Sequence, residues 1–413
     1  MPRRPRPGSR DRRPHVALAS RIFAPEPAAA SFRLWALTRA LGRLSATVSV
    51  VSVRPSAAVA SRATSGPGVD LPEGVTVSRW PVLRDASGVV RGYLPYLSFD
   101  VPLGLRLLFS RRPDVVVSEP PPTTGVVVRV ACALRRVPYV YYAADVWSDA
   151  ASSTGAPGLV VRLVTALERC ALRGARHTIA VSEGVADRVR ALGVPADRIT
   201  VVRNGIDTTT FTPDGPVEPQ PDSSPYLLYA GTASEWQGAE IFVEALAKVR
   251  ATVPDARVVF LGQGSAWPAM RATAESLGLG PESTGAVTFV DAAPPEGAAA
   301  WLRGARAALV SLRPGQGYDF AFPTKVFAAV ACGTPVLYAG PGPAGPVVSE
   351  NNLGTVTGYD VDEVAAAMTA LLVAERPDAA ERARLGTWVH DHASADSAGD
   401  LAAAVVRSAA RPG

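Results

Sequence analysis

The chain has 413 residues, more than one ordinary hydrophobic core accommodates, so two domains are expected. Hydrophobic residues make up 47% of it and charged residues 19%, which excludes a disordered chain. The net charge is only +5, and no nucleic-acid partner is expected. No stretch reaches the roughly 18 uninterrupted apolar residues of a membrane-spanning helix.

Two features bear on where the chain is found. Residues 1–14, most of "MPRRPRPGSRDRRPH", are predicted to form a disordered basic tail, either merely solvated or in contact with an anionic membrane surface. The apolar run "VALA" that follows is too short for a secretory signal. Cys132, Cys170 and Cys332 lack metal-type spacing, so buried thiols in a reducing compartment are expected. The predicted location is the cytoplasm, with peripheral contact at the inner face of the cell membrane left open.

A first domain, residues 15–211, is predicted from short β-branched runs that alternate with helical patterns. Strands are expected at 15–20, 47–53, 113–119, 138–145, 177–182 and 199–205, and helices at 30–44, 158–175 and 183–193. Nearly continuous apolar strands that alternate with helices are typical of a parallel sheet covered on both faces.

Residues 212–225 are rich in proline, acidic residues and serine and have no periodicity, which predicts an interdomain linker. The alternation then restarts in a second domain, residues 226–378. Residues 379–413 are alanine-rich and helical, and we expect them to pack back on the first domain. The predicted fold class is therefore α/β, with two doubly wound units in tandem. Ligands of such sheets bind at the carboxyl ends of the strands, and a cleft between two domains is a favoured site.

Four segments resemble, in the same order, the motifs of one enzyme family. They are "PYVYYAADVWSDAAS", "ITVVRNGIDTTTFTP", "LLYAGTASEWQGAEIFVEAL" and "FPTKVFAAVACGTPVLYAG". The order resembles the retaining GT-B nucleotide-sugar glycosyltransferases of family 4, especially the cell-surface polysaccharide type, from about residue 15 to 375. The resemblance implies two Rossmann-like domains, the first binding the acceptor and the second the donor. It implies no cofactor, because the nucleotide-diphosphate sugar is a substrate.

Lys325 is the first candidate for stabilising a diphosphate. Of the 42 lysines and arginines, only Lys248 and Lys325 are lysine. Lys325 follows Pro323 and Thr324 at the start of a predicted helix, where an ammonium group and the helix dipole can act on the same phosphate. In the family the matching lysine lies by the donor, whereas the alternative is an ordinary surface lysine. No metal is expected, because "DVDE" (360–363), which has Asp-x-Asp spacing, opens a predicted helix as a cap.

Other donor-side candidates lie in loops that follow strands. Gly231 and Thr232 are expected to present backbone amides to a phosphate. Gly262 and Gly264 either meet the nucleobase through backbone or form a plain tight turn, and Arg313 either assists at the edge of the cleft or is merely solvated. The resemblance implies a donor-binding set that consists of Gly231, Thr232, Gln237, Gly262, Gly264, Arg313, Asp319, Pro323, Thr324, Lys325 and Ala328.

Asp145 is the candidate group on the acceptor side. It ends a strand that reads as buried, and its carboxylate either orients a sugar or acceptor hydroxyl or caps a helix. Asp145 and Lys325 are therefore the two catalytic candidates. The resemblance places Ala29, Ala30, Trp147 and Asn204 on the acceptor side as well.

The sequence departs from the family pattern at three places. Ala328 stands where the family has the glutamate that grips the donor ribose, and Asp319 is the nearest upstream acid that could replace it. Alanines 28–30 replace the usual glycine loop, and alanine resists the positive φ that glycine permits. Ala144 precedes Asp145, where relatives often have histidine or arginine. The departures at Ala328 and at alanines 28–30 indicate a different donor or a weakened enzyme.

The function implied by the resemblance is that of a glycosyltransferase, a hexosyl- or N-acetylhexosaminyl-transferase. It would move a sugar from a nucleotide-diphosphate sugar to a glycan, lipid-linked or small-molecule acceptor, without metal and with retention. Two alternatives stay open. A nucleotide-sugar epimerase of the same fold would need acids and histidines for proton chemistry, and a non-catalytic sugar-nucleotide-binding or assembly protein would explain Ala328 and Ala144.

Overall fold

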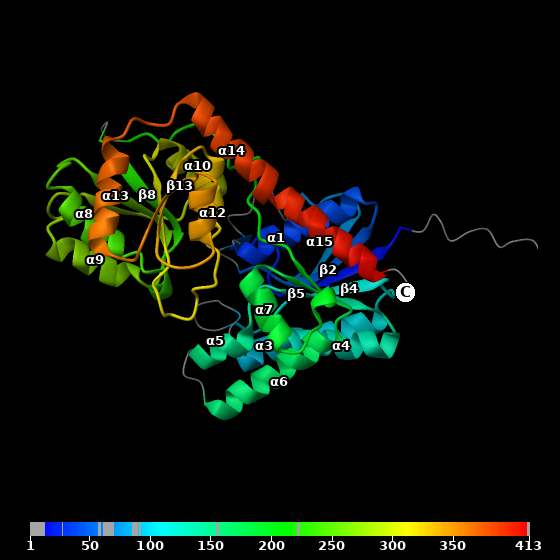
Figure 1. Ribbon diagram of the computed structural model, residues 1–413. Helices are drawn as coiled ribbons and strands as arrows, with labels where there is room; N and C mark the ends of the chain where they lie inside the picture. Colours follow the sequence, from blue (N-terminus) through cyan, green and yellow to red (C-terminus); the bar gives the residue numbers. More distant parts are fainter. Residues whose placement is uncertain are drawn as a thin grey trace, which may run out of the picture. The chain divides into compact units, whose positions relative to one another are not determined.

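The computed structural model describes residues 13–26, 28–56, 59–60, 70–84, 90, 92–153, 157–220 and 224–410. The chain forms two compact units (Figure 1). Unit 1 comprises residues 1–204 together with 395–413, and unit 2 comprises residues 205–394. Each unit contains one parallel sheet, which confirms the predicted α/β fold class.

Unit 1 is built on a seven-stranded parallel sheet with the strand order β3-β2-β1-β4-β5-β6-β7. Every residue of β1, β4 and β5 is buried, as the near-continuous apolar runs predicted. The chain order reverses between β1 and β4, the switch point at which doubly wound sheets bind ligands. The strands are β1 (His15–Ala19), β2 (Thr47–Val53), β3 (Val75–Trp80), β4 (Val115–Ser118), β5 (Tyr139–Ala143), β6 (His177–Ala180) and β7 (Ile199–Val201).

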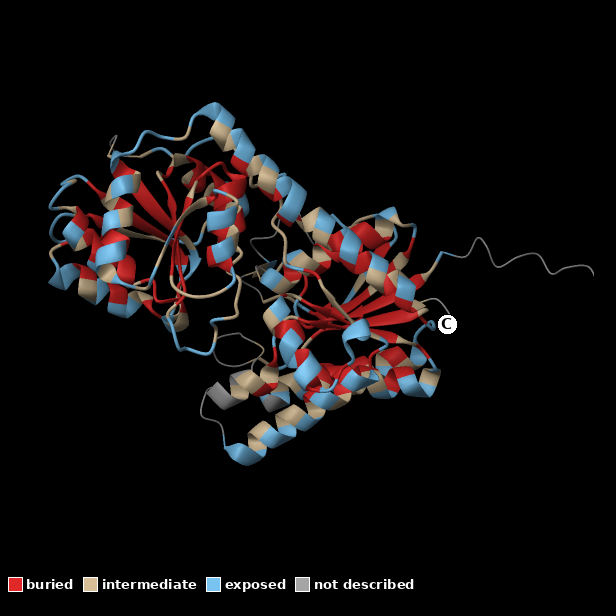
Figure 2. Ribbon diagram, in the orientation of Figure 1, coloured by how far each residue is buried: buried red, intermediate tan, exposed pale blue. Residues whose placement is uncertain are grey.

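Helices cover both faces of this sheet. Helices α1 and α15 lie together on one face, whereas α3, α4 and α6 lie on the other (Figure 1). The burial colours of Figure 2 show the strands between these two layers as almost entirely buried. The helices of unit 1 are α1 (Ala29–Arg43), α3 (Tyr93–Phe109), α4 (Pro122–Arg135), α5 (Trp147–Ser153), α6 (Gly158–Gly174), α7 (Glu183–Ala191) and α15 (Ala395–Ala410), with a 3₁₀ turn, η1 (Ala196–Arg198).

Unit 2 is built on a six-stranded parallel sheet with the order β10-β9-β8-β11-β12-β13, whose switch point lies between β8 and β11. Alternate residues of β8 enter the cores on the two faces of the sheet, Leu227 and Tyr229 on one and Tyr226 and Leu228 on the other. The strands are β8 (Tyr226–Thr232), β9 (Arg257–Gln263), β10 (Val287–Asp291), β11 (Ala308–Ser311), β12 (Val336–Ala339) and β13 (Gly354–Thr357).

Helices also flank both faces of the second sheet. Helices α8 and α13 pack on the face of Leu227, and α10, α11, α12 and α14 contribute to the core on the face of Leu228. The helices are α8 (Ile241–Val249), α9 (Trp267–Ser276), α10 (Pro295–Gly304), α11 (Lys325–Ala331), α12 (Ala344–Glu350), α13 (Val361–Val373) and α14 (Ala379–Ala393), with a 3₁₀ turn, η2 (Glu235–Gln237).

The boundary between the units lies before the predicted linker. Residues 212–220 carry no helix or strand, and they are bound within unit 2. The Arg303 side chain donates from Nε to the Pro216 carbonyl at 2.8 Å and from Nη1 to the Thr212 carbonyl at 3.1 Å. The division falls instead between Asn204 and Gly205, and again between Ser394 and Ala395.

The helical C-terminal segment is shared between the units. Helix α14 packs with α11 in unit 2, whereas α15 packs on α1 in unit 1. Arg43 forms ion pairs with Asp396 at 3.4 Å and with Asp400 at 2.7 Å. Gly399 approaches α1 so closely that an added Cβ would lie 2.6 Å from the Ala36 carbonyl oxygen. Glycine is therefore required here by packing, although it weakens a helix.

Three further predictions concern burial and the chain start. Cys132 and Cys332 are buried as expected, but Cys170 is only half-buried. The predicted basic tail lies outside the described residues except for Arg13 and Pro14. In the part of the chain that the structure describes, no helix combines the length and apolar character needed to cross a membrane.

The contact between Gly399 and Ala36 makes a prediction about stability. In an open helix, Gly→Ala stabilises by about 1 kcal/mol. We expect Gly399→Ala to destabilise unit 1 instead, by about 1–3 kcal/mol, because backbone must move to admit the methyl group. Gly158→Ala is the matched control, since nothing lies within 4 Å of a Cβ added there. The measurement is urea unfolding; equal effects of the two substitutions would contradict the packing argument.

Candidate functional site

Lys325 reaches the carboxyl end of β8, at the switch point of the second sheet. Its Nζ donates to the Tyr229 hydroxyl at 2.7 Å and to the Thr232 carbonyl at 2.9 Å. It also lies 3.9 Å from the centre of the Tyr229 ring. A Cβ added to Gly231 would lie 3.6 Å from Cε of Lys325, so the glycine leaves room beside the ammonium group. The structure thus brings together Lys325, Gly231 and Thr232 from two distant parts of the sequence.

The Lys325 ammonium group has an unusual electrostatic setting. The surrounding protein removes much of its water, which lowers the pKa of Lys325 to about 7. Among the described residues, no carboxylate forms an ion pair with it. Its bonded partners are a neutral hydroxyl and a carbonyl, since burial raises the pKa of Tyr229 further above its ordinary value. A lysine held in this way is poorly compensated, and an anionic ligand would supply the missing charge.

Gly262 and Gly264 let the ends of β8 and β9 approach each other. Gly262 has a φ of +143° and pairs with Gly231, and a Cβ on it would lie 2.3 Å from the Gly231 carbonyl oxygen. A Cβ on Gly264 would lie 1.9 Å from the Ala233 carbonyl oxygen. These contacts favour the tight turn over a role that needs open space. Contact with a nucleobase through the backbone stays a prediction.

Gln237 and Arg313 have partners within the protein. The Gln237 side chain is buried and accepts a hydrogen bond from the Ser234 amide at 2.9 Å, which closes a capping box on η2. The Arg313 guanidinium pairs with Glu240, whose carboxylate lies 3.0 Å from the Tyr359 hydroxyl. The side chains of both predicted donor residues are therefore bonded to residues in or next to the loop after β8.

The remaining donor-side candidates lie on the segment between β11 and α11. Asp319 is exposed, and its carboxylate accepts from the Gly315 amide at 3.4 Å. Pro323 and Thr324 are half-buried just before α11, and Ala328 lies half-buried one turn into it. This segment is joined to the loop after β8 by two rings that the sequence did not single out, Trp236 and Tyr318. Their rings stack with centres 4.6 Å apart.

The Asp-x-Asp spacing at residues 360–362 serves a cap, as predicted. The Asp360 side chain accepts from the backbone amides of Asp362 and Glu363 at 2.9 and 3.0 Å, at the start of α13. The second lysine of the chain, Lys248, pairs with Asp362 at the surface. Among the described residues no group of three or more histidine, cysteine, aspartate and glutamate side chains is placed to hold a metal ion.

The carboxyl ends of the strands in unit 1 hold a buried ion pair that the sequence did not reveal. Arg33, on α1, donates to Glu119 Oε1 at 2.5 and 3.2 Å, and Glu119 follows β4 directly. The second carboxylate oxygen accepts from the Ser20 hydroxyl at 3.0 Å, just after β1. Burial alone would lower the pKa of Arg33, but the Glu119 carboxylate outweighs it and the pKa is raised. Arg33 therefore stays charged at the switch point of the first sheet.

Two acceptor-side candidates lie around Arg33. Its Nη1 donates to Asn204 Oδ1 at 3.2 Å, and its guanidinium lies 5.0 Å from the centre of the Tyr142 ring. Asp145, two residues after β5, is solvent-exposed, yet the protein around it raises the pKa of its carboxyl, and Arg33 opposes that rise. Asp145 and Asn204 thus share Arg33 as a neighbour.

The other acceptor-side candidates are less closely connected to this cluster. Trp147 begins α5, where its amide donates to Glu168 at 2.7 Å and its ring packs edge-on against Tyr96 with centres 5.8 Å apart. Ala29 and Ala30 form the first turn of α1, which carries Arg33 one turn further on. Arginine is so frequent in this chain that Arg33 gave no signal of its own. The short spacing from the alanines to Arg33 is the clue that could have found it.

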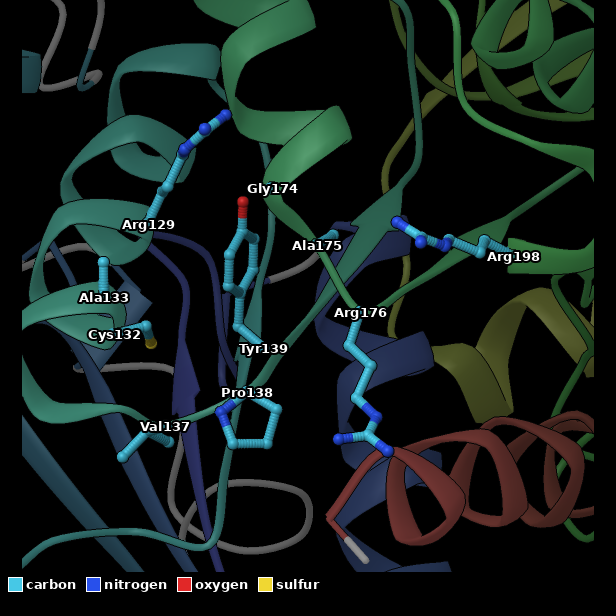
Figure 3. A pocket seen from close by; sticks show the side chains of 10 residues that line it. All are labelled: Arg129, Cys132, Ala133, Val137, Pro138, Tyr139, Gly174, Ala175, Arg176 and Arg198. Atoms are coloured by element: carbon cyan, nitrogen blue, oxygen red, sulfur yellow. The ribbon is translucent and has the colours of Figure 1, made fainter. Parts of the chain in front are cut away.

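A cavity of about 640 Å³ lies elsewhere in unit 1 (Figure 3). Arg129, Tyr139, Gly174 and Arg198 are among its lining residues, and it sits where β5 begins and α6 ends. A Cβ on Gly174 would lie 2.6 Å from the Tyr139 hydroxyl. The cavity is thus at the amino ends of the strands, the opposite edge of the sheet from Glu119 and Asp145. It is not part of the candidate site.

Comparisons with known proteins match both units to glycosyltransferase family models. Residues 30–210 match the family model Glycosyltransferase Family 4, and residues 224–373 match Glycosyl transferases group 1. A D-inositol 3-phosphate glycosyltransferase of Xylanimonas cellulosilytica is 32% identical over 218 residues, 49% of this chain and 49% of that protein. One from Stackebrandtia nassauensis is 29% identical over 233 residues, 53% of this chain and 49% of that protein. The chain spans about half the length of these curated relatives.

Solved structures share the architecture over nearly the whole chain. HepE from Anabaena, crystallised with UDP and glucose, has a TM-score of 0.69 at 17% identity and covers 95% of this chain and 99% of its own. A Listeria monocytogenes protein described as a UDP-N-acetylglucosamine 2-epimerase has a TM-score of 0.60 at 14% identity, covering 96% of each chain. These likenesses show the GT-B fold. The two family models, which match residues 30–210 and 224–373, show that the chain belongs to the family 4 glycosyltransferases.

Proposed function

We propose that the protein transfers a sugar from a nucleoside diphosphate sugar to an acceptor hydroxyl, and that Lys325 binds the diphosphate of the donor. The observation that carries the proposal is the Lys325 ammonium group, which lies at the switch point of unit 2 with a lowered pKa and no carboxylate partner among the described residues. The family matches of both units support the same reaction.

The chemistry explains why a lysine is suited to this position. When the bond between the sugar's anomeric carbon and the diphosphate breaks, the bonding electrons leave with the diphosphate and negative charge develops on its oxygen. A preorganised cation in a place that water does not fill stabilises this charge strongly. Gly231 leaves the space beside Lys325 open. We propose that binding needs no metal, because the cation supplies the charge that a metal would otherwise supply.

Asp145 is the residue we propose to act on the acceptor side. Its raised pKa makes it a stronger base than an ordinary aspartate, and it can orient a hydroxyl by accepting its hydrogen bond. The acceptor hydroxyl belongs to a glycan, a lipid-linked molecule or a small molecule. The names of two curated relatives make D-inositol 3-phosphate the small molecule to test first. Retention at the anomeric carbon is proposed from the family resemblance.

The two alternatives make different demands on the site. An epimerase needs acid and base groups beside the sugar, but the groups that Lys325 contacts are a tyrosine hydroxyl and a backbone carbonyl. A non-catalytic binding protein would fit Ala328, because the side chain there is too short to hold a ribose. Chemical analysis of the donor after incubation separates the three: transfer, isomerisation or recovery unchanged.

The first prediction concerns nucleotide binding. Lys325→Met should weaken the binding of UDP, GDP, TDP or ADP, whichever binds, by about 1.5–3 kcal/mol, as expected for loss of a hydrogen bond to a charged group. Lys248→Met is the matched control, because Lys248 pairs with Asp362 at the surface, and it should bind as the wild type does. The measurement is titration calorimetry without metal. Binding of none of the four nucleotides to the wild type would contradict the proposal.

The second prediction concerns pH. In the free protein Lys325 loses its proton near pH 7, because its pKa is lowered to about 7, and a bound diphosphate raises that pKa again. Affinity should therefore fall by up to about tenfold for each pH unit between roughly pH 7 and pH 9, with uptake of up to about one proton per nucleotide. Calorimetry in buffers with different ionisation enthalpies measures the uptake. An equal uptake in Lys325→Met would assign the proton to another group.

The lowered pKa of Lys325 also predicts that the Lys325→Met variant folds as stably as the wild type. A lysine whose pKa is lower in the folded than in the unfolded chain costs stability at every pH below the unfolded value, and this cost is complete below the folded value. Its removal is therefore not expected to lower the melting temperature at neutral pH. A large fall in melting temperature would show that Lys325 has a structural role.

The third prediction concerns Asp145. Asp145→Asn should lower kcat for sugar transfer by about 10²-fold, because the neutral amide oxygen is a far weaker base and a weaker hydrogen-bond acceptor than the carboxylate, while nucleotide binding stays unchanged. Asp149→Asn is the control; Asp149 lies four residues further on and pairs with Arg188 at 3.3 Å. Similar losses in both variants, or full activity in Asp145→Asn, would remove Asp145 from the mechanism.

A further inference from the structure

Helix α3 carries an exposed apolar stripe along its whole length. Its inner face buries Phe99, Leu103 and Leu107 against the rest of unit 1. On the outer face, five large apolar side chains are exposed by fractions that run from 48% to 83%. They are Leu94, Leu97, Val101, Leu105 and Phe109.

The spacing of these residues makes the stripe continuous. They follow one another at intervals of three or four positions, which keeps them within a sector of about 120° around the helix axis. Single exposed apolar side chains are normal in globular proteins, but a contiguous apolar patch marks a surface that contacts something else.

The neighbouring helices α4 and α6 also carry exposed apolar side chains. Helix α4 packs against both α3 and α6, and the three helices form one layer on the same side of the sheet (Figure 1). Val130 and Leu134 are exposed one turn apart on α4, and Leu159 and Leu163 are exposed one turn apart on α6. These four residues and the five of the α3 stripe define the α3–α4–α6 face.

The charge on these helices has one sign. Helices α3, α4 and α6 contain two carboxylates, and both are buried: Asp100 in α3 and Glu168 in α6. Six arginines lie within the helices and four more just after their ends. The arginines are Arg106, Arg129, Arg135, Arg162, Arg169 and Arg173, followed by Arg111 and Arg112 after α3, Arg136 after α4 and Arg176 after α6. The three helices therefore carry exposed apolar side chains and arginines, but no exposed carboxylate.

We propose that the α3–α4–α6 face docks on the surface of a membrane that contains anionic phospholipids. Apolar side chains on the outer face of an amphipathic helix enter the boundary between headgroups and acyl chains, and the guanidinium groups attract anionic headgroups. A second copy of the chain fits the same face poorly, because arginines would meet arginines with no exposed carboxylate between them. This attachment needs no spanning helix.

Co-sedimentation with vesicles tests the proposal on the full chain. The vesicles are pure phosphatidylcholine, or phosphatidylcholine mixed with phosphatidylglycerol. The wild type should sediment with the mixed vesicles at low salt, and less so at high salt. The double variant Val101→Asp/Leu105→Asp should bind at least about tenfold more weakly. The basic residues 1–14 are present in every protein compared, so the difference reports on the face alone.

The matched control is Val373→Asp/Leu401→Asp. Val373 on α13 and Leu401 on α15 are exposed apolar residues outside the face, and the charge change is the same. This variant should bind as the wild type does. Circular dichroism melting checks that each variant folds, and Val101→Ser/Leu105→Ser replaces the aspartate variant if it does not.

Three results would overturn the proposal. The first is recovery of the wild type only in the supernatant, and the second is binding of the face variant as tightly as the control. The third comes from sedimentation velocity. If the wild type is a dimer, and Val101→Asp/Leu105→Asp is a monomer that still binds vesicles as the wild type does, the face contacts a second copy of the chain.

Discussion

The candidate donor site depends on one ammonium group held against the end of a strand. Lys325 starts α11, but its Nζ is fixed by β8, through the Tyr229 hydroxyl and the Thr232 carbonyl. A planar guanidinium would not fill this place in the same way, because its donors fork in a plane whereas an ammonium group is a compact point charge. In a chain that otherwise uses arginine almost throughout, that difference gives a physical reason for the lysine. The protein around the ammonium group also removes water from it, which lowers the pKa of Lys325.

Unit 1 has a buried and fully paired charge at its own switch point. Arg33 and Glu119 are buried and hydrogen-bonded to each other. Glu119 also accepts from the Ser20 hydroxyl, and Arg33 also donates to the Asn204 side chain. Removing one partner of such a pair would cost about 3–5 kcal/mol, because the other charge would stay buried alone. The pair is therefore a fixed platform beside Asp145. Lys325, which has no such partner among the described residues, is the group that an anionic ligand would complete.

The sequence predicted the fold through its alternation of apolar strands and helices, since burial of both sheet faces dictates that pattern. Helix α3 was not predicted. Pro102 lies inside it, and its exposed face is apolar like its buried face, so the sequence shows no alternation of polar and apolar residues with a helical period. Lys325 was predictable because lysine is rare here and follows Pro-Thr before a helix. The hydrogen bond between Gln237 and Ser234 and the ion pair between Arg313 and Glu240 were not predictable, because the local fold and not the residue type sets each pairing. Arg33 and Glu119 lie 86 positions apart, and only the sheet brings them together.

The most direct test of the account is a crystal structure of the protein with the nucleoside diphosphate that binds it. The account predicts a diphosphate oxygen within about 3 Å of Lys325 Nζ, the distance of a charge-assisted hydrogen bond, beside the open space at Gly231. A diphosphate bound elsewhere, for example among the arginines of the cavity around Arg129 and Arg198, with Lys325 still bonded only to Tyr229 and Thr232, would contradict it.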